Sequence, residues 1–357
     1  MLGNRTLFIV GAGASFEFGL PLGAKLAQNI AEKLHFEFDY NGLVKGDESF
    51  YSALRQNFSD HNVLRSHLNA CARIRTGIRL AGSIDNYIDA HKEEAEVALL
   101  GKLAIVDCIA KAEKSSKLYF EPHSSKLVFD VEKLGKTWIT EVVGILFYGV
   151  SKANVATVFD NLSIISFNYD RCIQQALVLA LHTQFHLDIS QCYELVNKLQ
   201  IIYPYGSLGT LSPLHDAKSV PFGADIYQPY LFELSKNIRT YSEQVADAAL
   251  ASQISAEVTK AKNIVFLGCA YHQQNINMLK SQNVALDKAI LGTAHGISSD
   301  GVSIKSASLF EAISGMSANE ALSEKISSKY DAFLNVRLFN NMKCFDLMNE
   351  FRHSLQK

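Results

Sequence analysis

The sequence predicts an α/β protein, built as a parallel sheet with an inserted all-helical module. Two observations lead to this prediction. Short apolar runs that end in glycine or polar residues alternate with stretches of helical periodicity, which is typical of parallel sheets covered by helices. Between the first and the second apolar run, residues 38–158 show helical patterns alone. The predicted division is a sheet-forming domain of residues 1–37 and 159–357 and a helical module of residues 38–158.

The first predicted strand, Leu7–Val10, is a continuous apolar run with β-branched members, as in strands buried on both faces. It ends in the turn Gly11–Ser15, where glycines let the backbone bend sharply and let a phosphate approach the amide groups. Strand, glycine turn and helix open a nucleotide-binding unit. Phe16 replaces the third glycine of the GxGxxG fingerprint, so a tight turn without a ligand stays an alternative. The helix is predicted from apolar residues every four positions: Leu22, Leu26, Ile30 and Leu34.

The helical module follows a polar connection at Asp39–Glu48. Its main element is a long helix that begins at Ser83 and carries apolar residues on one face as far as Ala110. Ser83 is a candidate N-cap, and Asp85 lies in the first turn, where the helix dipole favours a carboxylate. Asp85 either interacts with that dipole alone or contributes to a ligand site. A second helix is predicted over residues 131–148.

The α/β pattern then resumes. A helix with an apolar stripe at Ile173–Leu181 follows the second strand, and the helix Cys344–Leu355 follows the last. A loop-rich stretch is predicted over residues 210–229, before a helix that ends near Lys260. The strands predicted in this part are Leu162–Ser166, Ile201–Tyr203, Asn263–Leu267, Lys288–Leu291 and Val336–Phe339.

Composition describes an ordinary globular protein, with 357 residues, 48% hydrophobic residues and a net charge of -2. This charge offers no electrostatic basis for binding nucleic acid or an anionic membrane. No signal peptide pattern and no apolar run of about 18 residues is present, so a cytoplasmic protein without a membrane partner is expected. The six cysteines are scattered without any CxxC pair, which excludes a Cys₄ zinc ribbon, and no metal site is predicted.

Four predicted strands end in small or polar residues, at Gly11–Ser15, Asn168–Asp170, Gly206-Ser207 and Gly268–Ala270. Because ligands bind beyond the carboxyl ends of parallel strands, we expect these residues to converge on one crevice. A purely structural role stays open for three of these residues. Asn168 is otherwise a turn residue, Asp170 the N-cap of the next helix, and Gly268 a site of close strand–helix packing.

The ordered motifs resemble the sirtuin-like domain, in particular its divergent bacterial branch from antiphage defence systems. The resemblance covers residues 6–295 and implies a Rossmann-type NAD-binding domain with the helical module across the crevice. It implies that NAD is a substrate, cleaved to nicotinamide and ADP-ribose, and that no cofactor is needed. The implied partners are a second copy of the chain or a protein such as a defence-system ATPase or trigger. The motifs that carry it are Gly11-Ala-Gly-Ala-Ser15 with Gly19-Leu-Pro21, Ser83-Ile-Asp85, Ser166-Phe-Asn168-Tyr-Asp170, Gly206-Ser207-Leu208 and Phe266-Leu-Gly268.

The same resemblance implies a role for each matching residue. Asn168 contacts the nicotinamide ribose and positions the attacking group, and Asp170 helps to hold the nicotinamide side. An amide can donate and accept at once, so Asn168 is able to hold a ribose hydroxyl and a water together. Gly268 is implied to approach the adenosine half of the dinucleotide, and Gly206 and Ser207 to line the ribose pocket. The residues implied to hold the dinucleotide phosphates are Gly11, Ala12, Gly13 and Ser15.

Two features depart from sirtuin deacylases. Tyr205 stands where they have a catalytic histidine, and a phenol with a pKa near 10 is a poor base. Either Tyr205 lines the pocket or His215, His186 or His272 takes over as the base. The zinc cysteines and the Asp-Phe-Arg after Pro21 are also missing, which argues against deacylation.

Hydrolysis of NAD is therefore the leading interpretation of the sequence. The alternative from another class is a catalytically weak module that senses NAD or ADP-ribose and regulates a partner, which Tyr205 favours. A dehydrogenase is disfavoured, because no acidic residue closes a second strand about twenty residues after the glycine turn.

Overall fold

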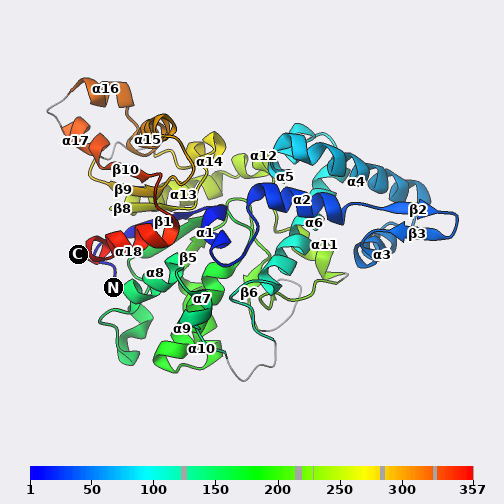
Figure 1. Ribbon diagram of the computed structural model, residues 1–357, viewed down its shortest axis with the longest axis horizontal. Helices are drawn as coiled ribbons and strands as arrows, with labels where there is room; N and C mark the ends of the chain where they lie inside the picture. Colours follow the sequence, from blue (N-terminus) through cyan, green and yellow to red (C-terminus); the bar gives the residue numbers. More distant parts are fainter. Residues whose placement is uncertain (122–126, 214–218, 228, 282–285, 325–327, 357) are drawn as a thin grey trace.

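The centre of the structure is a parallel sheet with helices on both faces (Figure 1). The computed structural model describes residues 1–121, 127–213, 219–227, 229–281, 286–324 and 328–356. Within these residues the sheet has six strands in the order β5-β4-β1-β8-β9-β10, all parallel to their neighbours. Numbered along the chain this is the order 3-2-1-4-5-6 of the Rossmann fold. The predicted α/β class with a parallel sheet is confirmed.

The strand bounds agree with the apolar runs of the sequence to within two residues. All five residues of β1 are buried, because β4 pairs with it on one side and β8 on the other. Side chains alternate between the two faces, so Phe8 and Val10 join one apolar core while Leu7 and Ile9 join another. The strands are β1 (Thr6–Val10), β4 (Leu162–Ser166), β5 (Gln200–Ile202), β8 (Asn263–Leu267), β9 (Ala289–Thr293) and β10 (Val336–Phe339).

One face of the sheet, the lower one in Figure 1, packs on a core around the buried Trp138. The Trp138 ring lies edge-on to Phe8 of β1, with ring centroids 6.4 Å apart. This face is covered by α7 (Val131–Leu134), α8 (Trp138–Phe147), η1 (Lys152–Thr157), α9 (Cys172–Phe185), α10 (Ile189–Lys198) and α18 (Cys344–Leu355). The opposite face packs on α13 (Ala248–Lys260), α14 (Gln273–Met278), α15 (Ser299–Ser314), α16 (Ala318–Ser323) and α17 (Ser328–Leu334).

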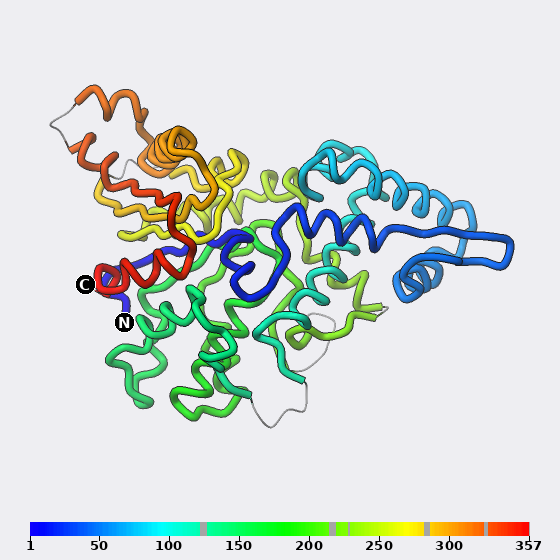
Figure 2. The backbone as a smooth tube through the Cα atoms, in the orientation of Figure 1, coloured from blue at the N-terminus to red at the C-terminus, as the bar shows by residue number. Residues whose placement is uncertain are grey.

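A third apolar core holds together the helices that extend to the right in Figures 1 and 2. It also includes Tyr169 and Tyr205, which follow β4 and β5, so this core reaches the carboxyl edge of the sheet. Its elements are α2 (Gly23–Lys33), α3 (Glu48–Asn57), α4 (His61–Ala81), α5 (Ile84–Ala90), α6 (Ala95–Lys114) and α11 (Tyr230–Ser235). Smaller elements nearby are α12 (Tyr241–Val245) and the two-stranded sheet of β6 (Thr210–Leu211) and β7 (Ser219–Val220).

The helical region differs from the expected pattern in three places. It begins with an antiparallel hairpin, β2 (Glu37–Asp39) and β3 (Gly42–Lys45), at its far end (Figure 2). The helix that Ser83 caps ends at Ala90, and α6 starts afresh after a break at residues 91–94. The helix predicted over 131–148 is divided at Gly135, whose φ is +60°. Ser83 is the expected N-cap, since its side chain accepts from the Asn86 amide.

Glu17, just after the glycine turn, ties two helix starts together. Its carboxylate accepts from the amides of Trp138 at 2.7 Å and Phe345 at 3.0 Å, the first residue of α8 and the second of α18. Both helix dipoles favour a negative charge at this point, while burial raises the pKa of the Glu17 carboxyl. The two ends of the chain also meet, because the Gly3 amide donates to the Leu355 carbonyl (Figure 2).

Candidate functional site

The glycine turn after β1 packs backbone to backbone against the turn after β8. It continues into α1 (Ala12–Phe16), and the Gly13 amide donates to the Gly268 carbonyl at 2.9 Å. Gly268 has φ +64°, and a Cβ added there would lie 2.0 Å from the Ala14 nitrogen. A Cβ at Gly13 would lie 2.8 Å from the Cα of Gly268. Both glycines are therefore required by the contact between the turns, which is the packing role left open for Gly268. The Gly13 amide was expected to bind a phosphate, but in the structure it donates to a backbone carbonyl of the protein.

Asn168, two residues beyond β4, joins this glycine turn. The residue is 8% exposed, and its Nδ2 donates to the Gly11 carbonyl and to the Ser15 hydroxyl, both at 2.9 Å. Asp170 also hydrogen-bonds Ser15 and accepts from the Cys172 amide at the start of α9. Burial raises the pKa of the Asp170 carboxyl. The expected convergence of the β1 and β4 ends is thus present, and Asp170 serves both Ser15 and the helix start.

Tyr169 points the opposite way from its two neighbours and meets the helical region. Its hydroxyl donates to the carboxylate of Asp85 in the first turn of α5. Its ring lies 6.4 Å from that of Tyr205, which in turn lies 6.2 Å from the Phe167 ring. Burial raises the pKa of Asp85, against the lowering effects of the Tyr169 hydrogen bond and the charge of His272. Asp85 is therefore more than a helix-dipole partner, and sequence patterns did not single out Tyr169 as its partner.

Tyr205 donates its hydroxyl to Oδ1 of Asn275 on α14 at 2.8 Å. Burial raises its pKa still further above the ordinary value for a phenol, so it stays protonated at neutral pH. Of the candidate histidines, His272 is exposed at the N-cap of α14 and acts electrostatically on Asp85. His186 follows the 14-residue α9, about 21 Å from the helix start beside Asp170. His215 lies outside the described residues.

A neighbouring segment of the chain packs so closely on residue 206 that only glycine fits there. Its φ is +79°, and an added Cβ would lie 1.8 Å from the Asn237 carbonyl oxygen, just after α11. The Arg239 amide donates to the Tyr205 carbonyl at 2.9 Å, which holds the two segments together. Ser207 is half-buried beside this contact. The ribose role that the resemblance implies for Gly206 and Ser207 stays a prediction.

A buried ion pair fastens α6 to the segment that carries Asp170. Arg171 and Glu113 both have side chains with 0% exposure, and their charged groups meet at 2.6 Å. The Glu113 carboxylate also accepts the backbone amides of Arg171 and Gly223. Neither residue belongs to a sequence motif, and Glu113 lies in the polar, lysine-rich run Lys111–Lys117, so the sequence carries no signal of this pair.

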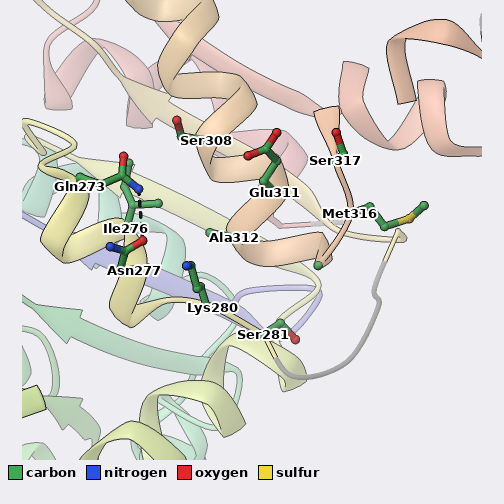
Figure 3. A pocket seen from close by; sticks show the side chains of 11 residues that line it. Gln273, Ile276, Asn277, Lys280, Ser281, Ser308, Glu311, Ala312, Met316 and Ser317 are labelled. Carbon is green, nitrogen blue, oxygen red and sulfur yellow. Dashed lines mark hydrogen bonds between the residues drawn. The ribbon is translucent and has the colours of Figure 1, made fainter. Parts of the chain in front are cut away.

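A separate cleft of about 490 Å³ lies between α14 and α15 (Figure 3). None of the residues predicted to bind a ligand lines it. Asn277 and Gln273, which are hydrogen-bonded to each other, line its α14 side, and Ser308 and Glu311 line its α15 side. The remaining lining residues are Ile276, Lys280, Ser281, Ala312, Gly315, Met316 and Ser317.

The fold and the strand-end residues define a Rossmann-like parallel α/β protein with a glycine turn at its central strand. Comparison of the sequence with protein-family models and with curated proteins finds no match. Within the described ranges, no helix combines the length and the apolar character that crossing a membrane requires. The same ranges hold no cluster of three or more His, Cys, Asp or Glu side chains arranged to bind a metal ion.

Proposed function

We propose that the protein hydrolyses NAD to nicotinamide and ADP-ribose, as a cytoplasmic effector that depletes NAD in bacterial antiphage defence. The observation that carries this proposal is the hydrogen bonding of Asn168 to both ends of the glycine turn, at Gly11 and Ser15. It brings the residue expected to act at the nicotinamide ribose next to the loop expected near the phosphates. In a sheet of this strand order, dinucleotides bind at that edge.

The surroundings of Asn168 suit the chemistry of this reaction. Cleavage of the bond between nicotinamide and ribose passes through an oxocarbenium-like state and needs an oriented water in a site that otherwise excludes solvent. Asn168 is almost fully buried, and so are Tyr169 and Tyr205, which follow the neighbouring strands β4 and β5. Because both N–H groups of Asn168 are used within the protein, its carbonyl oxygen is the atom that would accept from a ribose hydroxyl or a water.

A sensor of NAD or ADP-ribose that regulates a partner is the second candidate function. It is favoured by the hydrogen bonds inside the site, where the Gly13 amide and the Tyr205 hydroxyl already have protein partners. Tyr205 is also no base, because burial raises its pKa. A defence-system ATPase, a trigger protein or a second copy of the chain would be the regulated partner under either function.

Release of nicotinamide from NAD by the purified full-length chain tests the proposal. We expect Asn168→Ala to lose about 10²- to 10⁴-fold in turnover, the usual contribution of a positioned polar group, while calorimetry still detects NAD binding. Asn161→Ala is the matched control. It removes an amide-to-carbonyl hydrogen bond of 3.0 Å, to Leu2, just before β4 at the opposite edge of the sheet.

Three outcomes separate the candidate functions. Equal turnover by wild type and Asn168→Ala would assign Asn168 to the turn alone and place the chemistry elsewhere. Binding of NAD without release of nicotinamide, with a partner protein added as well, would favour the sensor. A wild-type chain that, with a partner protein added as well, cleaves no NAD and binds neither NAD nor ADP-ribose would refute both functions.

A further inference from the structure

Asp85 is the carboxyl group that the helical region brings to the strand ends. It lies in the first turn of α5, and Tyr169 beyond β4 donates a hydrogen bond to its Oδ1. Its charge acts on the hydroxyl of Tyr205 beyond β5 and interacts with His272 beyond β8. Asp85 thus lies near residues that follow three of the strands, at the edge where a parallel sheet binds its ligand.

We propose that the carboxylate of Asp85 is the base that takes the proton of the attacking water. This inference rests on the proposed hydrolysis of NAD and names the group that fills the role left vacant by Tyr205. In the reaction, the bond between nicotinamide and C1′ of the ribose breaks, and its electron pair goes to the pyridine nitrogen, which becomes neutral. The water oxygen forms the new bond to C1′, and its proton goes to the Asp85 carboxylate and from there to solvent.

The other ionisable groups that follow β4 and β5 are less suited to this role. The buried carboxyl of Asp170 already has two partners, because it hydrogen-bonds the Ser15 hydroxyl and accepts from the Cys172 amide. The phenol of Tyr205 is held by Asn275. Among the described residues, Tyr169 alone donates to Asp85 from another element, and Asp85 is only half-buried, so a water can reach its carboxylate.

The charge of Asp85 also suits the substrate. The reaction moves positive charge from the pyridinium nitrogen to the ribose, so a carboxylate closer to C1′ than to the ring lowers the barrier as well as accepting a proton. The groups that act on the Asp85 carboxylate are Tyr169 and His272, whereas the charges of Asp89 and Tyr241 act, with that of Asp85, on Tyr205.

This setting determines the sign of the pH dependence. Burial raises the pKa of Asp85, and a base must be deprotonated, so turnover falls as the pH falls through that raised pKa. The Tyr169 hydroxyl opposes the rise, because it donates to the charged form. Removing this hydroxyl therefore moves the acid limb of the pH–rate profile to higher pH.

The experiment measures nicotinamide release against pH for the full-length chain, with NAD binding by calorimetry. We expect Asp85→Asn to lose about 10²- to 10⁴-fold in turnover at neutral pH, with the acid limb absent from the residual rate and NAD still bound. Tyr169→Phe should retain turnover at high pH and show the acid limb at higher pH than wild type. Asp89→Asn makes the same change of charge one turn further along α5 and should keep the wild-type profile.

Each result bears on a different statement. Nicotinamide release by Asp85→Asn at the wild-type rate and with the wild-type acid limb would overturn the role of Asp85 and leave NAD hydrolysis intact. An unshifted acid limb in Tyr169→Phe would overturn it independently, even if Asp85→Asn failed to fold. A wild-type chain that binds NAD but releases no nicotinamide would refute the proposed function and this role together.

Discussion

Replacement of Gly268 by alanine tests whether the contact between the two glycine turns is as tight as the structure shows. Gly268 has φ +64°, which costs a residue with a Cβ about 1–2 kcal/mol. The new Cβ would also lie 2.0 Å from the Ala14 nitrogen and 2.4 Å from the Gly13 carbonyl carbon, both backbone atoms. Relieving an overlap of this kind typically costs about 1–3 kcal/mol. The two contributions together predict a loss of about 2–5 kcal/mol in the free energy of unfolding.

Urea denaturation followed by circular dichroism measures this loss. Gly149→Ala is the matched control, since Gly149 has a similar φ of +73° and nothing within 4 Å of an added Cβ. Its expected cost is the backbone strain alone, about 1–2 kcal/mol. Since the Gly268 overlap displaces the glycine turn, NAD affinity should also fall in Gly268→Ala and stay unchanged in Gly149→Ala. Equal losses of stability in the two variants would refute the reasoning, because the overlap would then contribute nothing.

Two further predictions concern charges outside the glycine turns. Glu113→Gln should lower the free energy of unfolding by about 3–5 kcal/mol, because it leaves the fully buried charge of Arg171 unpaired. Burial raises the pKa of Asp47, but hydrogen bonds from Lys33 and the Phe50 amide and nearby lysine charges outweigh it and lower the pKa from 3.8 to about 2. Asp47 should therefore stabilise the fold by about 2 kcal/mol above pH 4, and this stabilisation should be lost as the pH falls through 2.

Controls for these two predictions come from the same chain. Glu243→Gln breaks the Lys102 ion pair, in which the Glu243 side chain is 51% exposed, and should cost less than about 1 kcal/mol. A similar cost for Glu113→Gln would contradict the importance of its burial. For Asp47, urea denaturation of wild type and Asp47→Asn between pH 6 and pH 2 measures the contribution, since asparagine still caps α3. A difference in stability that does not shrink over this range would contradict the lowered pKa.

The sheet could be predicted from the sequence because its central strands, β1, β4 and β8, are almost fully buried. A buried parallel strand appears in the sequence as a continuous apolar run. β1, β4 and β8 each coincide with such a run, and each run ends in a turn. The break between α5 and α6 was missed because residues 91–94 contain neither glycine nor proline, and apolar residues continue at helical spacing across it. The hairpin β2–β3 had a usable signal in Asn41-Gly42, the dipeptide that favours tight hairpin turns.

The strand-end site could be predicted only in part. The rule that ligands meet the carboxyl ends of parallel strands brings Asn168 near the glycine turn, and the structure shows their hydrogen bond. The contact between Gly13 and Gly268 depends on how closely two turns approach, which spacing along the chain does not encode. The pairing of Asp85 with Tyr169 joins residues 84 positions apart, and neither one alone indicates the other.

The place of β1 in the middle of the sheet sets the order in which a growing chain can fold. β1 is the first strand to be made, yet its two neighbours are residues 162–166 and 263–267. At about 5–20 residues per second, the ribosome needs roughly ten to fifty seconds after β1 to complete the second neighbour. During that interval an apolar strand has unpaired edges, a condition that promotes aggregation and slows folding. The nascent chain is therefore most dependent on chaperones at its N-terminal strand, the segment that later carries the glycine turn.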